Sequence, residues 1–462
     1  MFETSVYQER RKKLSGQLDT GLLLFLGNEE SPMNYEDNTY HFRQDSSFLY
    51  FFGLDMPGLA TVIDLDENRE VLFGYDFTVD DIIWMGPQPK LSEKAEQAGI
   101  NESLPISELK DYLHNALEKG RTIHYLPPYR AGHLQTLSEF LQKPLPEVKS
   151  GASKPFIKAV VALRSVKSDA EVAEIEKALD ITCDMHNAAM RMVRPGIREQ
   201  IIAGAMQGIA AAKGAGLAFP TIFSINGQTL HNHSHHNILQ EGRMVVNDSG
   251  AAANSHYAGD ITRTLPVSGK FTDQQKEIYE IVLEAQLKAI EEIRPEITFK
   301  EVHLLASRVI AEGLTSVGLM RGDTMEAVAQ GAHALFFPHG LGHMMGLDVH
   351  DMENLGEQYV GYDESVERSG QFGLAYLRLA KPLKTGFVLT VEPGIYFIPE
   401  LIDLWEKEKK FEAFIDYKKV SKYRDLGGIR IEDDVLLTEN GHRVLGKPIP
   451  KTVDEIENFK RG

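Results

Sequence analysis

The stretch VVNDSGAAANSHYAGDITRTLPV, residues 245–267, decides how the second half of this chain folds. Two runs rich in β-branched residues flank a segment of small and turn-forming residues, a pattern typical of two adjacent strands joined by a hairpin. Asp248 ends the first run, and Asp260 lies at the start of the second. A hairpin would bring both carboxylates to one face of a sheet. Taken singly, each aspartate is explained as well by a cap on a turn or strand end.

Three phrases further along the chain carry side chains of the same kind. They are His343 in HGLGHMMG (339–346), Glu392 in LTVEPGIY (389–396) and Glu432 in GIRIEDD (428–434). With the two aspartates they supply four carboxylates and one imidazole, mostly on β-like segments, which suits a pair of hard divalent cations. Carboxylates can bridge two ions, and a bridging water then becomes a nucleophile at neutral pH. The five residues therefore predict a dinuclear metal site.

Glycines set the character of the HGLGHMMG segment. His339 and His343 are four residues apart, but Gly340, Gly342 and Gly346 argue against a helix. The glutamate of the helical H-E-x-x-H zinc motif is also missing. Glycines beside a histidine indicate close approach of another chain segment or a ligand, although a packed loop histidine has the same pattern.

Other polar residues near these phrases have competing interpretations. Arg430 and Glu432 alternate with isoleucines and share one strand face, which predicts either a simple ion pair or a metal ligand beside an anion-binding arginine. In the run HNHSHH, residues 231–236, we expect one functional histidine and assign the others to solvent.

The helical patterns indicate an internal repeat. Ser168 with Glu171 and Thr272 with Gln275 are capping boxes, and each opens a long helix that ends at RPGI or RPEI. A second amphipathic helix follows in each case, at 198–213 and 299–317. Each half then offers an imidazole and two carboxylates. These features predict a pseudo-twofold domain with the metals on its axis.

The first 160 or so residues have a different pattern. Short apolar runs at 22–26, 48–52, 60–64 and 70–73 predict strands, and the amphipathic stretches between them predict helices. An α/β domain without a glycine-rich phosphate loop is expected. The segment KSGASKPF (149–156) favours a boundary there. We therefore expect domains at 1–155 and 156–462.

The composition of the chain limits the classes of binding partner and the cellular locations that are expected. The 462 residues carry a net charge of -18, which argues against nucleic acid or an anionic membrane as a partner. The single cysteine, Cys183, cannot form an intrachain disulfide and is predicted to be a core residue. The N-terminus lacks an apolar signal-peptide region, and no run is long enough to span a membrane. The cytoplasm is the expected location.

The ordered phrases DSGA, GDITRT, HGLGH, VEPGIY and GIRIEDD resemble the dinuclear Xaa-Pro peptidases, aminopeptidase P and prolidase, which have the pita-bread fold. FRQDSSFLYFFGLDMPG and the residues around Trp84 resemble the amino-terminal domain of the same family. The resemblance implies an α/β (α+β) protein, with an N-terminal α/β domain before a pseudo-twofold pita-bread catalytic domain. It also implies a homo-oligomer, a dimer or tetramer.

The resemblance also implies a role for each matching residue. Two divalent metals would be bound, manganese with zinc or cobalt as alternatives, and Asp260 and Glu432 would bridge them. The metal ligands would be Asp248, Asp260, His343, Glu392 and Glu432. The catalytic residues would be His231, His339, His350 and Glu392. The substrate-binding residues would be Arg378 and Arg430. Two departures are a slightly longer hairpin between the aspartates and a long, prolidase-like insertion between Glu392 and Glu432.

The expected function is that of a metal-dependent Xaa-Pro aminopeptidase, which hydrolyses the bond between an N-terminal residue and proline through a metal-bridging hydroxide. Proline-containing peptides would be its substrates. An Xaa-Pro dipeptidase, a non-catalytic peptide-binding module and a mononuclear zinc hydrolase are alternatives. The sequence leaves open how much peptide follows the proline, which residue precedes it, and which metal is used in the cell.

Overall fold

The computed structural model describes residues 1–459 and divides the chain into two compact units. The first contains Met1–Arg164 and the short segment Asn354–Tyr359, and the second contains Ser165–Glu353 and the chain from Val360 onward. The division falls in the last turn of helix α8 (Lys154–Ser165). Within the described residues, no helix combines the length and apolar character needed to cross a bilayer.

The first unit is built on a mixed five-stranded sheet in the order β4-β3-β2-β1-β5. Antiparallel pairs join β1 to β2 and β2 to β3, whereas β4 and β5 pair in parallel with β3 and β1. Apolar side chains of these strands, including Leu24, Val62 and Phe73, form a buried core with the helices. The strands are β1 (Leu22–Leu26), β2 (Ala60–Asp64), β3 (Arg69–Gly74), β4 (Glu102–Pro105) and β5 (Ile123–Tyr125).

The helices of this unit include one that the sequence analysis assigned wrongly. Residues 48–52 are not a strand but lie in helix α2 (Ser46–Phe52). The Asp45 side chain accepts a hydrogen bond from Phe48 N and caps the helix, and Gly53 ends it in the left-handed conformation. The remaining helices are α1 (Thr4–Ser15), α3 (Val79–Met85), α4 (Leu91–Ala98), α5 (Leu109–Glu118), α6 (Ala131–Leu141) and α7 (Leu145–Ser150).

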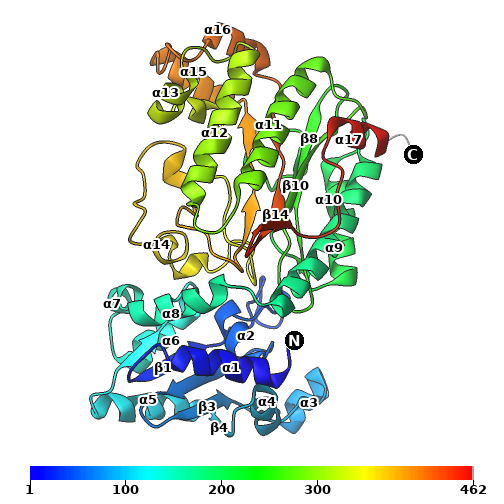
Figure 1. Ribbon diagram of the computed structural model, residues 1–462. Coiled ribbons are helices and arrows are strands. Elements are labelled where there is room, and N and C mark those ends of the chain that lie inside the picture. The colour runs from blue at the N-terminus through cyan, green and yellow to red at the C-terminus, as the bar shows by residue number, and fades with distance from the viewer. Residues whose placement is uncertain (460–462) are drawn as a thin grey trace. The chain divides into compact units, whose positions relative to one another are not determined.

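Two matching helix pairs organise the second unit, as the capping boxes predicted. Helix α9 (Asp169–Met192) begins at the Ser168–Glu171 box and packs on α10 (Glu199–Lys213). Helix α11 (Asp273–Glu292) begins at the Thr272–Gln275 box and packs on α12 (Phe299–Ser316). These long helices run alongside the central strands (Figure 1). Cys183 is buried on α9, as expected.

The strands of the second unit form small antiparallel sheets. One sheet has the order β10-β8-β7 and the other β11-β14-β15, and two-stranded pairs join β12 to β13 and β6 to β9. The strands are β6 (Gly216–Leu217), β7 (Ile222–Ser224), β8 (Met244–Ser249), β9 (Ala251–Ala252), β10 (Ile261–Pro266), β11 (Val388–Val391), β12 (Gly394–Tyr396), β13 (Gly428–Arg430), β14 (Asp433–Thr438) and β15 (Gly441–Val444).

Shorter helices complete this unit. Two of them, α15 and α16, lie in the insertion between β12 and β13. Trp405 on α15 is buried. These helices are α13 (Thr324–Gln330), α15 (Pro399–Lys407), α16 (Tyr417–Val420) and α17 (Val453–Phe459). Helix α14 (Glu357–Val360) begins within the segment Asn354–Tyr359, which belongs to the first unit.

Candidate metal centre

Strands β8 and β10 bring the two aspartates together, as the sequence of residues 245–267 predicted. The strands are antiparallel, and Asp248 on β8 lies opposite Thr262 on β10, two residues beyond Asp260. Gly250 and Gly259 allow the chain to fold back tightly, because a Cβ on Gly250 would collide with the Gly259 carbonyl oxygen. Both carboxylates are buried.

The HGLGHMMG segment runs beside β11, where its glycines are needed. Thr390 N donates to the His343 carbonyl oxygen at 3.0 Å, and Glu392 N donates to Leu341 at 2.8 Å. A Cβ on Gly342 would collide with the backbone of Thr390. The close backbone approach predicted from these glycines is confirmed, and it sets His343 beside Glu392.

Glu432 reaches the same place from the link between β13 and β14. Its backbone N donates to the Thr262 carbonyl oxygen at 3.1 Å, and the Thr262 hydroxyl donates to its Oε2 at 2.6 Å. Neighbouring Asp434 accepts from Asp260 N at 3.1 Å. These contacts join the two halves of the repeat.

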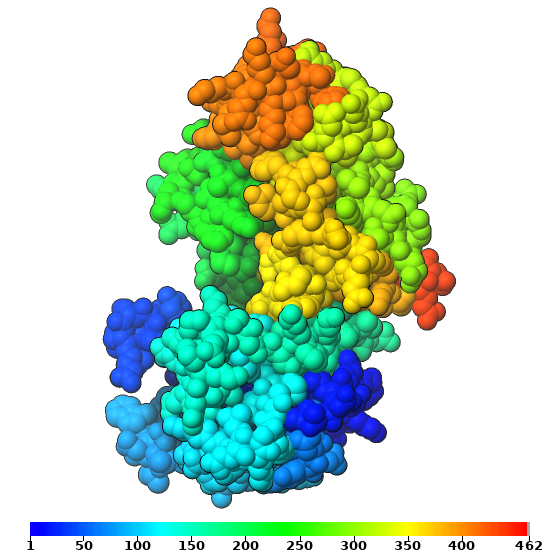
Figure 2. All heavy atoms as spheres, turned by 90° about the vertical axis from the view of Figure 1, so that its left-hand side faces the viewer, coloured from blue at the N-terminus to red at the C-terminus, as the bar shows by residue number. Residues whose placement is uncertain are grey.

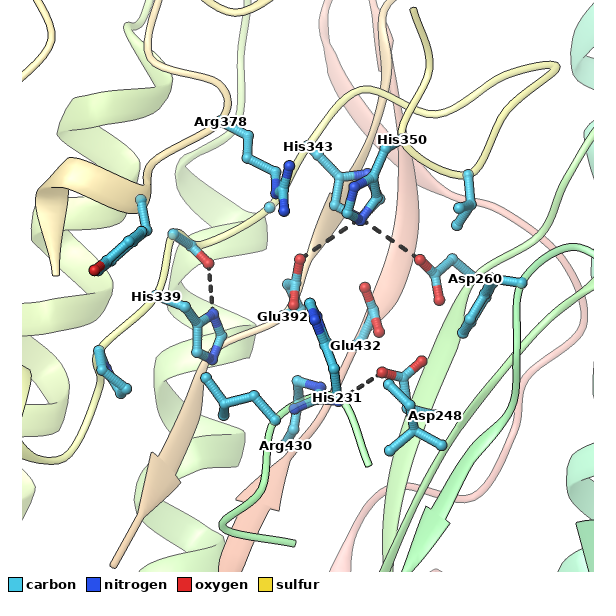
Figure 3. A pocket seen from close by; sticks show the side chains of 18 of the residues that line it. His231, Asp248, Asp260, His339, His343, His350, Arg378, Glu392, Arg430 and Glu432 are labelled. Carbon is cyan, nitrogen blue, oxygen red and sulfur yellow. Dashed lines mark hydrogen bonds and ion pairs between the residues drawn. The ribbon is translucent and has the colours of Figure 1, made fainter. Parts of the chain in front are cut away.

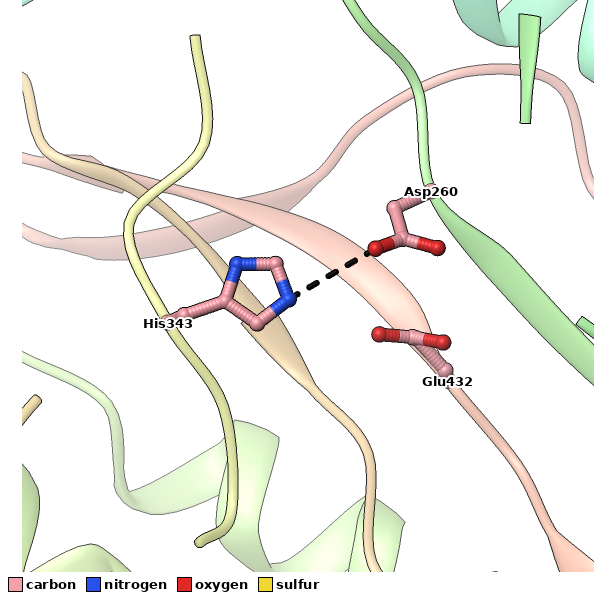
Figure 4. A group of neighbouring side chains, drawn as sticks. All are labelled: Asp260, His343 and Glu432. Atoms are coloured by element: carbon pink, nitrogen blue, oxygen red, sulfur yellow. Dashed lines mark ion pairs between the residues drawn. The ribbon is translucent and has the colours of Figure 1, made fainter. Parts of the chain in front are cut away.

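Asp260, His343 and Glu432 form a compact group of possible metal ligands (Figure 4). One ligand atom from each lies within 4.8 Å of the other two. His343 Nε2 is 3.5 Å from Asp260 Oδ2 and 3.6 Å from Glu392 Oε1. His343 Nδ1 faces the Met344 carbonyl oxygen at 3.1 Å, which can only accept. The proton therefore lies on Nδ1, and Nε2 keeps the lone pair that a metal requires.

Burial and mutual repulsion raise the pKa values of three carboxylates at this site. Burial, and to a smaller extent repulsion from Asp248, raises the pKa of Asp260 well above its usual value. Burial and the neighbouring carboxylates also raise the pKa of Glu432, and burial raises that of Glu392 to about 8. Asp260 Oδ1 is buried without a hydrogen-bond partner. A bound cation would relieve each of these costs.

Arg430 contacts both Asp248 and Tyr396 and so connects two parts of the site. Its Nη2 pairs with Asp248 Oδ2 at 2.5 Å, and its Nη1 donates to the Tyr396 hydroxyl at 2.8 Å. The Tyr396 hydroxyl lies 2.9 Å from His339 Nε2, while His339 Nδ1 faces the Gly340 carbonyl oxygen at 2.8 Å. His339 Nδ1 therefore carries the proton, and its Nε2 accepts from Tyr396. This chain of contacts orients Asp248.

His350 and Arg378 are linked by Glu353. His350 Nδ1 lies 2.6 Å from Glu353 Oε2, and Arg378 Nη1 forms an ion pair with Glu353 Oε1. The loop is anchored by the residue after His350, since Asp351 pairs with Lys167 at 3.0 Å with both side chains buried. The His343 and His350 rings are 4.1 Å apart between centroids.

All ten residues singled out from the sequence line one cavity of about 520 Å³ (Figure 3). His231 lies at its exposed edge, and His233 from the same run also lines it. Segments near residues 220–260 and 340–400 wall the cavity and adjoin at the surface (Figure 2). The apolar part of the wall comes from Phe219, Ile222, Leu230, Phe372, Tyr376, Ile398 and Leu401. Its size and mixed lining are typical of a small-molecule or peptide site.

Sequence reasoning missed three residues that hold the site together. Tyr396 and Thr262 lie inside quoted phrases, two residues beyond Gly394 and Asp260, so strand alternation could have indicated them. Glu353 follows His350 by three residues and begins a short 3-10 helix, Glu353–Leu355, that no periodic pattern in the sequence indicates. Only the folded chain shows that it meets Arg378.

Comparison with known proteins gives two family matches. Metallopeptidase family M24 matches residues 173–439, and the aminopeptidase P N-terminal domain matches residues 7–124. Xaa-Pro aminopeptidase of Escherichia coli is 32% identical over 98% of this chain and 96% of its own length. Human Xaa-Pro dipeptidase is 30% identical, with 98% and 91% covered.

A solved structure agrees with these matches. Proline aminopeptidase P II from Yersinia pestis superposes with a TM-score of 0.83 at 28% identity, and each chain is covered completely. The family resemblance and the fold class predicted from the sequence are thereby confirmed. Since the M24 match extends over more than half of the 462 residues, the chain belongs to metallopeptidase family M24 and carries an aminopeptidase P N-terminal domain before its catalytic domain.

Proposed function

We propose that this protein is a metal-dependent exopeptidase that hydrolyses the bond between an N-terminal residue and proline. The observation that carries the proposal is the convergence of three buried carboxylates, the half-buried carboxylate of Glu392 and an imidazole whose Nε2 is unprotonated, from five segments, in a single cavity. Similarity to Xaa-Pro aminopeptidase supports the same choice of substrate bond.

The residues fit a pair of divalent cations, for which we propose manganese. Asp248, Asp260, His343, Glu392 and Glu432 would hold them, with Asp260 and Glu432 shared between the two. The raised carboxylate pKa values and the unpaired Asp260 Oδ1 are the properties expected of ligands that need a cation. When bound, such ions polarise a carbonyl group and activate water.

The cavity histidines take different roles in this proposal. Because His350 donates from Nδ1 to Glu353, its neutral ring offers Nε2 to the cavity as an acceptor. His231, at the cavity edge, is placed to donate to the oxyanion that forms on the scissile carbonyl. His339 acts through Tyr396 by keeping Arg430 and Asp248 in position.

Two further groups serve the departing end of the substrate. Glu392 would carry a proton to the proline nitrogen, which leaves as a secondary amine. Arg378 would bind the prolyl end, since it lines the cavity and retains 34% side-chain exposure. Arg430 is more deeply buried and is engaged by Asp248, so its contribution is mainly to hold that ligand.

Metal-ligand variants test the proposal. Asp260→Ala and Glu432→Ala should each reduce hydrolysis of Ala-Pro-Ala to background and lower the bound manganese, because each removes a carboxylate that would hold the metal. Glu439→Ala, an exposed carboxylate just beyond β14, is the matched control and should retain both activity and metal. Circular dichroism would verify folding. Full activity in either ligand variant refutes the dinuclear model.

An Xaa-Pro dipeptidase is the second candidate, and similarity to the human enzyme of that name favours it. Relative rates on Ala-Pro and Ala-Pro-Ala distinguish the two. Absence of bound metal after incubation of the protein with manganese would instead support a non-catalytic peptide-binding module.

The homo-oligomer and the cytoplasmic location stay predictions. Light scattering after size exclusion should give the mass of two or four chains. Cell fractionation would test the compartment.

A further inference from the structure

Glu353 forms an ion pair with Arg378, one of the two arginines that line the cavity. Its Oε1 pairs with Arg378 Nη1, and its Oε2 lies 2.6 Å from His350 Nδ1. Side-chain exposure is 34% for Glu353, 34% for Arg378 and 31% for His350. The trio therefore remains partly accessible.

This ion pair changes what Arg378 offers to a substrate. An unpaired guanidinium would attract a free proline carboxylate, usually with two parallel hydrogen bonds. Here Glu353 already balances the charge, and an incoming carboxylate also meets repulsion from Glu353. A peptide carbonyl oxygen carries no net charge, so it can accept a hydrogen bond from Arg378 without that repulsion.

Arg430, the second arginine of the cavity, does not provide an unbalanced positive charge for a substrate carboxylate. Arg430 is 4% exposed and is paired with Asp248 at 2.5 Å. Arg378 and Arg430 are the only arginine or lysine residues among the described residues that line the cavity. Each is thus matched by its own carboxylate.

Resting on the proposed function, we infer that Glu353 is a specificity-determining residue. By neutralising Arg378, it disfavours Xaa-Pro dipeptides, whose proline ends in a carboxylate, and favours peptides that continue beyond the proline. The protein then acts as an aminopeptidase on peptides longer than a dipeptide.

Three substrates with the same scissile bond separate charge from length. They are Ala-Pro, Ala-Pro with a C-terminal amide, and Ala-Pro-Ala. For the wild type, kcat/KM should be lowest for Ala-Pro, and the amide should behave like the tripeptide. Glu353→Gln keeps an oxygen acceptor for His350 but removes the charge. It should raise the ratio of kcat/KM for Ala-Pro over the amide about tenfold, equivalent to about 1.4 kcal/mol.

Two companion variants complete the experiment. Glu353→Asp retains the charge and should keep the wild-type ratio, whereas Glu367→Gln makes the same change at an exposed position outside the cavity lining and should also leave it unaltered. A purely structural role would change kcat/KM of all three substrates by the same factor. An unchanged Ala-Pro to amide ratio in Glu353→Gln overturns the inference alone. Absence of hydrolysis of every substrate by the wild type overturns the proposed function, and the inference with it.

Discussion

Tyr396 shows how much of the site depends on one hydroxyl group. It accepts from Arg430, which pairs with Asp248, and it lies within hydrogen-bond distance of His339. Burial raises the pKa of Tyr396 to about 12, so the hydroxyl keeps its proton and can donate to His339. A single O–H group therefore couples a candidate ligand to a candidate active-site histidine.

Tyr396→Phe should lower kcat/KM by about 10- to 100-fold. Hydrogen bonds to charged groups contribute about 1.5–3 kcal/mol, and each 1.4 kcal/mol is tenfold. Bound manganese should change little, because no ligand is removed. Tyr279→Phe is the control, since its buried hydroxyl donates to the Lys451 carbonyl oxygen outside the cavity. Wild-type kinetics in Tyr396→Phe would contradict the positioning role.

At the residue scale, the sequence indicated the candidate residues but not the partners that position them. All ten residues singled out line one cavity. Most of them lay in a phrase with a strand end or a neighbouring glycine, whereas Arg378 was indicated only by the family resemblance. Glu353 has no such signal, and its meeting with Arg378 depends on the path of a loop. Tertiary contacts of that kind follow from packing rather than from local pattern.

Among the elements, the paired long helices were predicted most reliably, because capping boxes act locally. Ser168 accepts from Glu171 N, and Thr272 accepts from Gln275 N. By contrast, residues 48–52 were wrongly predicted to be a strand. The run is apolar throughout and fully buried, so periodicity could not distinguish the two conformations, and the Asp45 cap and Gly53 decided the outcome.

Loss of either cap should destabilise the second unit by similar amounts. Ser168→Ala and Thr272→Ala should each cost about 1 kcal/mol of unfolding free energy, as N-cap deletions usually do. Urea unfolding followed by circular dichroism measures the change. Ser168→Thr preserves the capping oxygen and should stay close to the wild type. A cost below a few tenths of a kcal/mol would show that packing alone determines where the helices start.

The end of β2 carries a pH-dependent contribution in the first unit. Burial alone would raise the pKa of Asp64, but hydrogen bonds from Arg121 and from the Glu67 backbone outweigh it, and the pKa is lowered. Since the folded pKa lies below the unfolded value of about 3.9, the stabilisation is complete above that pH and is lost as the pH falls below it.

Asp64→Asn should therefore destabilise the protein at pH 7 and much less at pH 3. The expected cost at pH 7 is about 1–3 kcal/mol, the range for hydrogen bonds to charged groups. Thermal unfolding at the two pH values provides the comparison. An equal loss at both values would mean that the charge of Asp64 contributes nothing.

For the whole molecule, metal should stabilise one unit and not the other. All five candidate ligands belong to the unit that begins at Ser165. Manganese at about 100 times its dissociation constant should add about 2.7 kcal/mol to the stability of that unit. Differential scanning calorimetry with manganese and with a chelator should move the transition of the second unit only. A shift confined to the transition of the first unit would place the metal elsewhere.

The separation of the ligands along the chain has a consequence for biosynthesis. Asp248 and Glu432 are 184 positions apart (432 − 248), and Glu432 bonds directly to the strand that follows Asp260. At roughly 5–20 residues per second, a ribosome needs roughly 9–37 s to travel that distance. During this interval the hairpin aspartates have been synthesised but their partners have not. Binding of metal by the full proposed ligand set would therefore follow synthesis of the last strands, and would mark a completed second unit rather than nucleate its folding.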